Sequence, residues 1–386
     1  MARGLRALDR LGAVLCLAGA LALLLLPFVD LKPNRILPGN PRLLHQVLPL
    51  AAAIAAYALL GAAGAVALLV ANARVRILAA VLGLIVIGWA LASGADALTP
   101  PGNRVVRVAA GTGFWVLLLT LGLMAADGIT RLRPGPALRV ALLLGALGIC
   151  AFLLSHGTFD NVSVVREYAV NAARFGHEVR QHIVLAMGSL LAGAVVALPT
   201  GVVCHRVPRL RPGVLGTLNV IQTIPAIALF GILMAPLGAL AAALPVTARL
   251  GISGIGTAPA VVALFLYTLL PIVANTSAGL ARVSPATVEA ARGMGMTSWQ
   301  SLTSVELALA LPVIITGVRI ALVQNIGMAT IAALIGGGGL GTFVFQGIGQ
   351  TAIDLVLLGA IPTVALAFSC AVVLDAVVEV LHRGRA

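Results

Sequence analysis

The chain has 386 residues, of which 60% are hydrophobic and only 10% are charged, and its formal net charge is +13. Soluble domains carry about 25% charged residues, so this composition excludes an ordinary water-soluble enzyme and a disordered protein. The mean hydropathy of +1.10 is typical of a chain made mostly of membrane helices. Although a positive charge can indicate nucleic-acid binding, basic residues in short membrane loops set the topology. We therefore expect a polytopic protein in a lipid bilayer, with no nucleic acid as partner.

Hydropathy divides the chain into about ten apolar stretches, each close to the roughly 20 residues that cross a bilayer. Their approximate limits are 11–29, 47–71, 77–97, 109–126, 138–155, 183–203, 214–236, 257–279, 306–327 and 352–380. The first stretch follows arginines, as a signal peptide does, but it lacks a small-residue cleavage site and is expected to remain as an anchor. Basic residues are more frequent in the segments on the N-terminal side of the membrane, which favours both termini in the cytoplasm. The expected fold is an all-α polytopic membrane helix bundle.

Polar residues divide the chain into three parts. Residues 1–155 hold five expected spans and few polar motifs, and residues 183–386 hold five more. The intervening residues 156–182 are polar, and their apolar positions, such as Val165 and Phe175, have helical spacing. This pattern predicts a short interfacial helix outside the membrane. We therefore predict an N-terminal membrane extension, an external linker and a C-terminal core.

Few residue patterns in the chain suit catalysis, metal binding or nucleotide binding. The six histidines form no i,i+4 pair on one span, and the four cysteines lie far apart, mostly within apolar runs. The glycine run at 336–339 is not a phosphate-binding loop, because that motif needs a lysine and the only lysine is Lys32. We therefore expect no cofactor, no metal and no ATPase site. Active transport would take its energy from a partner or from an ion gradient.

The segment between the eighth and ninth expected spans has the signals of two short helices joined by a sharp turn. Ser284 is an N-cap residue, and Pro285 suits the first helical position. Gly295 can adopt the left-handed conformation that ends a helix. Thr297 and Gln300 form a capping-box pattern for a second helix, which leads into the ninth span. Since a plain connector needs neither cap, we expect the segment to place an amphipathic helix on the cytoplasmic face.

The run Glu289-Ala290-Ala291, followed after three residues by Gly295, resembles the EAA loop of ABC importer permeases. The match departs from the family pattern at Ala308, where a proline is expected. The resemblance implies a type I ABC importer permease core in 183–386, with the coupling loop at 284–305. In that family the loop helix docks in a groove of a separate ATPase subunit and transmits its closure. The coupling residues that the resemblance implies are Glu289, Ala290, Ala291, Gly293 and Gly295.

Two further stretches, 219–229 and 319–341, are similar to permeases for glycine betaine, choline, carnitine and related osmoprotectants. Gln181-His182 with Ser189 resembles the start of the same core, and the N-terminal spans resemble a Yeh-type subgroup. The resemblance implies import across a bacterial inner membrane. Its implied partners are an ABC ATPase pair, an extracytoplasmic substrate-binding protein and a second copy of the permease. Because aromatic residues make up only 4% of the chain, substrate selectivity is expected to lie in the binding protein.

Polar residues inside the core spans are candidates for the translocation pathway or gate. Pro225 removes a backbone donor, so it either exposes polar backbone to a cavity or is a tolerated membrane proline. Arg319 lies near mid-depth and needs a partner; gating or inter-subunit contact and a structural ion pair are the alternatives. The glycine run favours an irregular external hairpin, either a gate or a plain loop. The candidates are Gln222, Thr223, Pro225, Arg319, Gln324, Asn325, Gly336 and Gly339.

Two other function classes remain open from the residues alone. An ion-coupled secondary transporter of small polar solutes predicts an acidic relay inside the membrane and inverted repeats. Asp354 and Asp375, the acids deep in the last segment, have the positions of helix-end or interface residues. The other alternative is a membrane scaffold subunit without transport. Genes for an ATPase and a binding protein beside this one would separate the three functions.

Overall fold

The computed structural model describes residues 9–35, 37–103, 105–244, 246 and 251–383. Both chain termini, which we expect in the cytoplasm, lie outside these residues. The chain forms two compact units, the first from Met1–Gly135, Leu144–Val170 and Gln350–Asp354, and the second from Pro136–Leu143, Asn171–Gly349 and Leu355–Ala386. Three helices therefore contribute residues to both units: α6 (Pro136–Ser155), α7 (Ser163–Arg206) and α16 (Ile353–Arg383).

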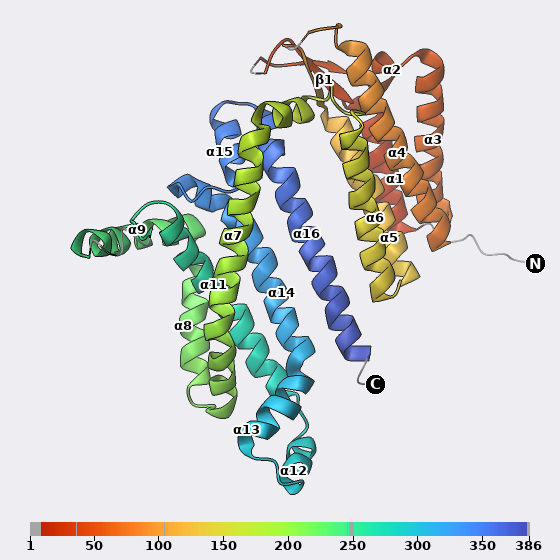
Figure 1. Cartoon of the computed structure of the whole chain (residues 1–386). Coiled ribbons are helices and arrows are strands. Elements are labelled where there is room, and N and C mark those ends of the chain that lie inside the picture. The colour runs from red at the N-terminus through yellow and green to blue at the C-terminus, as the bar shows by residue number, and fades with distance from the viewer. Residues whose placement is uncertain (1–8, 36, 104, 245, 247–250, 384–386) are drawn as a thin grey trace, which may run out of the picture. The chain divides into compact units, whose positions relative to one another are not determined.

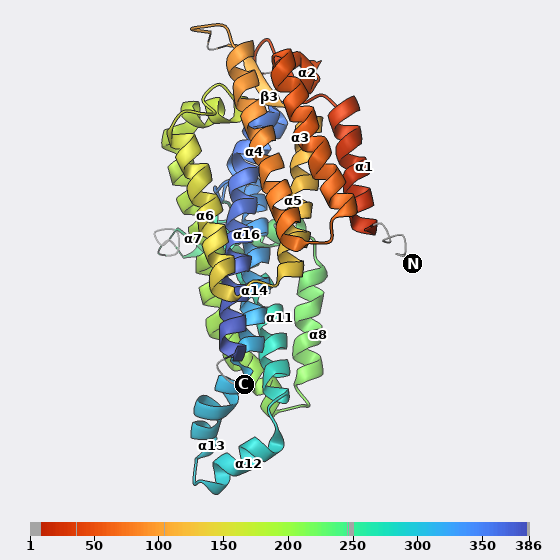
Figure 2. The same cartoon turned by 90° about the vertical axis from the view of Figure 1, so that its right-hand side faces the viewer.

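The first unit is mainly a bundle of apolar helices (Figures 1 and 2). Small residues at helical spacing form the buried face of α3, where Ala53, Ala56, Ala63 and Ala67 lie almost without exposure. Such residues let neighbouring helices approach closely, which favours their association in lipid. Besides its part of α6, the helices of the unit are α1 (Arg10–Leu25), α2 (Leu44–Val47), α3 (Leu50–Leu69), α4 (Ala73–Leu98) and α5 (Thr112–Leu132).

A three-stranded antiparallel sheet, which the sequence analysis did not predict, covers one end of the first unit. Strand β1 (Val29–Lys32) lies in the middle and pairs with β2 (Asn40–Arg42) and β3 (Arg107–Ala110). Each strand has only three or four residues. Runs this short show no alternating pattern that separates them from their apolar neighbours.

Buried ion pairs join this sheet to the first turns of α7 and α16 within the first unit. The Lys32 ammonium nitrogen lies 3.2 Å from a carboxylate oxygen of Asp354, and both side chains are nearly inaccessible. The Arg35 guanidinium lies 3.0 Å from the buried carboxylate of Glu167. Ionised groups without water need such partners, so these pairs fix where the two long helices begin relative to the sheet.

We expect Lys32→Met to destabilise the protein more than the double variant Lys32→Met/Asp354→Leu. The single change leaves a carboxylate that is 3% exposed without its ammonium partner, which costs about 3–5 kcal/mol. The double variant has no unpaired charge and is expected to be close to neutral. Thermal unfolding in detergent measures both effects. Equal losses in the two variants would show that the ion pair is not the cause.

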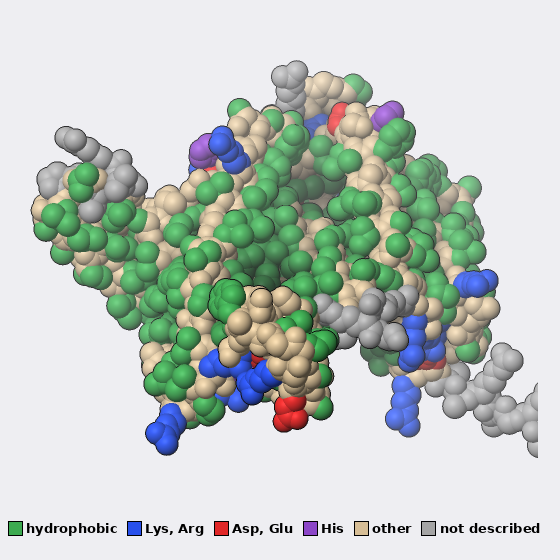
Figure 3. Space-filling view, turned by 60° about the horizontal axis from the view of Figure 1, so that its bottom comes forward, with side chains coloured by type: hydrophobic (Ala, Val, Ile, Leu, Met, Phe, Trp, Pro, Cys, Tyr) green, Lys and Arg blue, Asp and Glu red, His purple; other side chains and the backbone are tan. Residues whose placement is uncertain are grey.

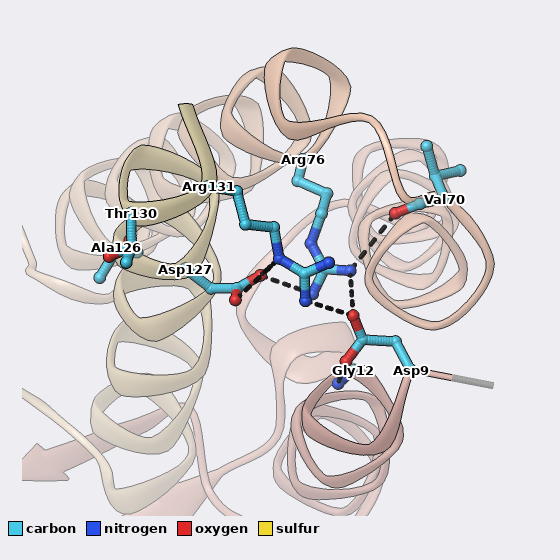
Figure 4. A network of polar contacts seen from close by, with 8 residues as sticks. All are labelled: Asp9, Gly12, Val70, Arg76, Ala126, Asp127, Thr130 and Arg131. Atoms are coloured by element: carbon cyan, nitrogen blue, oxygen red, sulfur yellow. Dashed lines mark hydrogen bonds and ion pairs between the residues drawn. The ribbon is translucent and has the colours of Figure 1, made fainter. Parts of the chain in front are cut away.

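The opposite end of the first unit carries a second ion network (Figure 4). The buried guanidinium of Arg76 lies 3.0 Å from the carboxylates of both Asp9 and Asp127, and Arg131 contacts the same two acids. The Gly12 backbone N–H donates to Asp9, and this bond, together with the Arg131 guanidinium, holds the pKa of the Asp9 carboxyl below its usual value. The stabilisation from Asp9 is therefore fully present above the ordinary pKa of an aspartate and is lost as the pH falls through the lowered pKa.

The second unit is built around α7, α11 and α14, which run side by side (Figures 1 and 2). A Cβ atom added at Gly317 of α14 would lie 2.6 Å from the Pro271 carbonyl oxygen of α11, so glycine is required for this close contact. Besides its parts of α6, α7 and α16, the long helices of the unit are α8 (Arg211–Thr223), α9 (Ala226–Ala243), α11 (Thr257–Ala281) and α14 (Leu307–Ile331).

The described helices agree with the predicted all-α membrane bundle of about ten spans. Nine of them are long and apolar enough to cross a membrane. Helix α1 is apolar as well but has only 16 residues. Hydrophobic side chains cover most of the surface seen in Figure 3, as expected where lipid takes the place of water.

The polar stretch 156–182 does not form a helix of its own. Helix α7 runs without a break for 44 residues, so the expected interfacial helix is the first half of the helix that contains the sixth span. The helical spacing of apolar residues correctly indicated a helical conformation. It does not reveal whether that segment and the sixth expected span form one continuous helix. Residues 177–187 contain no proline, glycine or N-cap residue, and therefore nothing ends the helix there.

The seventh expected span, 214–236, is broken into two helices. Helix α8 ends at Thr223, Ile224 is extended, and α9 leaves at a steep angle (Figure 1). Pro225 has no backbone N–H and disfavours the helical conformation of the residue before it. The proline therefore ends one helix and begins another, where the sequence analysis expected one continuous span.

Candidate functional site

The predicted helix–turn–helix segment is present at one end of the second unit. Helix α12 (Pro285–Gly293) begins after Ser284 with a proline in its first turn, and Gly295 has a φ of +83°. The Thr297 hydroxyl accepts a hydrogen bond from the Gln300 N–H, and the Gln300 side chain accepts one from the Thr297 N–H. This capping box opens the short α13 (Ser298–Gln300). The capping box and the glycine turn are confirmed, whereas Ser284 occupies the predicted N-cap position without a capping hydrogen bond from its side chain.

The α12–α13 segment presents an exposed surface of mixed chemistry. Of the predicted coupling residues, Glu289, Ala290, Gly293 and Gly295 are exposed, and Ala291 is buried on the inner face of α12. Two large apolar side chains flank the turn, Met294 with 72% and Trp299 with 71% exposure. Basic side chains gather around the same end of the unit (Figure 3). An exposed acid beside exposed apolar groups is suited to docking on another protein.

A buried ion pair joins this segment to the end of α7. After α13 the chain forms a π-helix at Ser301–Glu306, and the Glu306 carboxylate is 2% exposed. It accepts hydrogen bonds from the Arg206 guanidinium at 2.7 Å and from the Ser301 hydroxyl at 3.1 Å. The sequence analysis did not single out Glu306. Its partner Arg206 lies 100 residues earlier in the chain, and no local sequence signal indicates that the two residues pair.

The break between α8 and α9 holds the first group of pathway candidates. The Gln222 side-chain amide donates to the Tyr267 carbonyl oxygen at 2.9 Å, and the Tyr267 hydroxyl donates to the Ile224 carbonyl oxygen. Thr223 and Pro225 are exposed. Tyr267 of α11 therefore fixes both sides of the proline break, a role that the sequence analysis missed.

Arg319 of α14 forms an ion pair within the second unit. Its guanidinium contacts the Asp375 carboxylate of α16, and Arg139 lies 2.8 Å from the same carboxylate. This geometry agrees with the ion-pair alternative, since an arginine among membrane helices needs an acidic partner. The inter-subunit alternative stays a prediction.

Asn325 is fully buried at the meeting of three helices. Its amide donates to the Thr268 hydroxyl of α11 at 2.8 Å and to the Ser189 hydroxyl of α7 at 3.0 Å. Its side-chain oxygen has no hydrogen-bond partner within the part of the chain that the structure describes. The adjacent Gln324 is half-buried, and its amide lies 3.7 Å from the Met328 sulfur. Asn325 of α14 therefore links α7, α11 and α14 by hydrogen bonds inside the helix bundle.

The glycine run forms an irregular loop before α15 (Gly341–Gly349), at the end of the second unit opposite α12 (Figure 1). Gly336 and Gly339 have φ values of +79° and +85°, which favour glycine. The Gly339 N–H donates to the Glu178 carboxylate at 2.7 Å. Glu178 was missed, although it is an acid within an otherwise basic stretch of sequence. The candidates thus fall in separate places: the α12 end, the helix core with the α8–α9 break, and the glycine loop.

These features are those of a polytopic membrane protein with an exposed helix–turn–helix segment. Residues 189–386 match the family described as binding-protein-dependent transport system inner membrane component. The chain belongs to this family, as a multi-pass permease subunit of an ABC transporter. Residues 9–165 match a second family, the N-terminal domain of the ABC transporter permease YehY.

Individual relatives match a little more than half of the chain. The chain is 43% identical over 213 residues to the osmoprotectant import permease protein OsmW of Salmonella typhimurium, covering 55% of this chain and 91% of the relative. It is 34% identical over 213 residues to the glycine betaine/carnitine/choline permease protein OpuCB of Bacillus subtilis, covering 55% and 89%. A solved inward-facing structure of the MetNI methionine ABC transporter has 24% identity and a TM-score of 0.45, over 54% of this chain and 95% of that one.

Proposed function

We propose that the chain forms the translocation pathway of an ATP-driven importer for glycine betaine or related quaternary-ammonium osmolytes. The exposed segment from α12 through Gly295 to α13 is the observation that carries the proposal. It presents Glu289 and two apolar side chains for docking. The chain itself has no lysine-containing phosphate loop, so a separate ATPase would supply the energy. Relatives named for osmoprotectant, carnitine and choline transport support the substrate class.

The proposed assembly contains two copies of this chain, two ABC ATPase subunits and an extracytoplasmic substrate-binding protein. Each chain has one EAA-like segment, so two copies are needed to engage an ATPase pair. The α12 end would face the cytoplasm with both termini. The gathering of basic side chains at that end supports this orientation, because cytoplasmic loops are enriched in arginine and lysine (Figure 3).

Reconstitution of the three proteins in proteoliposomes tests the proposal. We expect uptake of radiolabelled glycine betaine that requires internal ATP and the binding protein and that persists when ionophores collapse ion gradients. The permease alone should not hydrolyse ATP. Uptake without ATP that the ionophores abolish would instead support the ion-coupled secondary transporter, and assembly without any uptake would support a scaffold role.

A further inference from the structure

An internal ion pair lies where the glycine loop and α15 meet α7. Arg174 and Glu178 are one turn apart on α7, and the Arg174 Nε atom lies 3.4 Å from a Glu178 carboxylate oxygen. Both charged groups also contact residues of the loop–α15 region. The anion reaches the glycine loop, whereas the cation lies over an aromatic ring. The two contacts therefore have different chemistry.

The Glu178 carboxylate occupies an anion-binding position. It accepts hydrogen bonds from the Gly339 N–H at 2.7 Å and the Thr342 hydroxyl at 3.2 Å, and the residue is 7% exposed. Gly338 and Gly339 have φ values of +73° and +85° and lie three and two residues before α15 begins at Gly341. Such loops direct backbone N–H groups at an anion, and the helix N-terminus adds favourable partial charge. The loop therefore suits any carboxylate, and here it holds one from its own chain.

The Arg174 guanidinium occupies a cation position. Its central carbon lies 5.7 Å from the centroid of the Phe343 ring, which stacks on Phe175 at 6.0 Å. The Phe343 side chain is fully buried, whereas 46% of the Arg174 side chain is exposed. Aromatic faces of this kind attract quaternary ammonium groups, which carry a diffuse positive charge and no N–H donors. The guanidinium also donates a hydrogen bond to the Gln346 side-chain oxygen at 3.1 Å. Because nearly half of the side chain is exposed, water can replace these partners when the guanidinium leaves the ring to another cation.

We propose that the Arg174–Glu178 pair fills, from within the chain, a subsite for a zwitterionic quaternary-ammonium carboxylate. The substrate carboxylate would replace Glu178 at Gly339 and Thr342, and its trimethylammonium group would replace Arg174 at Phe343. This inference rests on the proposed function and names the subsite for its substrate class. The exchange keeps the local charge balanced, because an internal zwitterion gives way to an external one.

The subsite would also make the glycine loop responsive to substrate. Glu178 is buried, so its release requires the loop to move away from α7. A Cβ atom at Gly339 would lie 3.1 Å from the Nδ1 atom of the buried His182, which shows how closely loop and helix pack. Substrate bound at Gly339 and Phe343 excludes Glu178 and Arg174 from these positions. It would therefore shift the equilibrium toward the arrangement in which the glycine loop has moved away from α7. Choline has no carboxylate and would engage only the ring, whereas betaine and carnitine carry both groups.

Equilibrium binding of radiolabelled glycine betaine tests the subsite. The permease–ATPase complex in nanodiscs, without binding protein, is compared with its Arg174→Ala/Glu178→Ala variant. Vacating the subsite is expected to tighten betaine binding about tenfold, because the internal occupant no longer competes. Acetate and tetramethylammonium should each compete with betaine in the double variant. Choline binding should gain less than betaine binding. Adding Thr342→Val to the double variant removes a donor to the substrate carboxylate. It should therefore weaken betaine binding and leave tetramethylammonium binding unchanged.

Arg180→Ala, an exposed arginine change on the same helix, is the matched control and should bind betaine as the unaltered complex does. Co-purification with the ATPase confirms that each variant is folded. Glu178→Gln, which keeps the shape of the side chain, should increase the affinity for betaine by less than the double variant does. It replaces the double variant in the test if that variant does not assemble with the ATPase. No gain in betaine binding, or a gain that acetate does not compete, would overturn the subsite. The proposed function fails separately, if the unaltered complex with binding protein imports no quaternary-ammonium compound.

Discussion

Replacing Gly295 with valine is expected to reduce ATP-driven uptake about tenfold or more, while the protein still reaches the membrane. Gly295 has a φ of +83°, a conformation that costs other residues about 1–2 kcal/mol, and β-branched residues are the least suited to it. A factor of ten corresponds to about 1.4 kcal/mol. No neighbouring atom lies within 4 Å of a Cβ added at Gly295. The loss would therefore come from a changed turn that misplaces α12, since there is no steric clash.

Gly148→Val is the matched control for this variant. Gly148 is exposed on α6 and does not have a positive φ. As at Gly295, a Cβ atom added there would lie more than 4 Å from any neighbouring atom. Uptake and substrate-stimulated ATP hydrolysis are measured at equal membrane abundance. Retention of both activities in Gly295→Val would show that this segment is not the coupling element. The secondary-transporter alternative would then regain support.

The helix–turn–helix segment from α12 to α13 was predictable because its signals are local. Ser284 with Pro285, the glycine at 295 and the Thr297–Gln300 box each act within four residues. The structure has the helix start, the turn and the box where they were expected, although the Ser284 side chain makes no capping hydrogen bond. Membrane helices were predictable for a similar reason. A run of about 20 apolar residues has few alternatives to a spanning helix.

The contacts that hold the candidate sites together were not predictable from one sequence. Glu178 meets Gly339 across 161 residues, and Gln222 meets Tyr267 across 45. Such pairings depend on how helices pack, and polar residues alone do not indicate which helix they will face. The proline break at 225 was underestimated for a related reason. Hydropathy values do not register that Pro225 lacks a backbone N–H. The stretch 214–236 was therefore predicted as one span, although its first helix ends at Thr223.

Glu306→Ala is expected to lower uptake and substrate-stimulated ATP hydrolysis about tenfold or more without loss of the protein from the membrane. Ser301 and Glu306 are the first and last residues of the π-helical turn. The Glu306 carboxylate accepts hydrogen bonds from the Ser301 hydroxyl and from the Arg206 guanidinium of α7, so it joins both ends of the turn to α7. Arg206 is 35% exposed, so its charge can reach water when the carboxylate is removed. A π-helical turn accommodates one extra residue and is unfavourable unless contacts hold it. Without Glu306, the turn can relax to α-helix and rotate the preceding α12–α13 segment by about 100° relative to α14.

The two sides of this pair are expected to respond differently, which separates coupling from folding. Arg206→Ala leaves a carboxylate that is 2% exposed without its partner, so it should lower the free energy of unfolding by about 3–5 kcal/mol. Glu306→Ala leaves only a half-exposed guanidinium, so it should lose uptake and substrate-stimulated ATP hydrolysis at nearly unchanged stability. Glu306→Gln keeps an acceptor for Ser301 and should retain part of the uptake. If Glu306→Ala transports normally, the π-helical turn does not fix the docking segment, and the link between α7 and the ATPase must lie elsewhere.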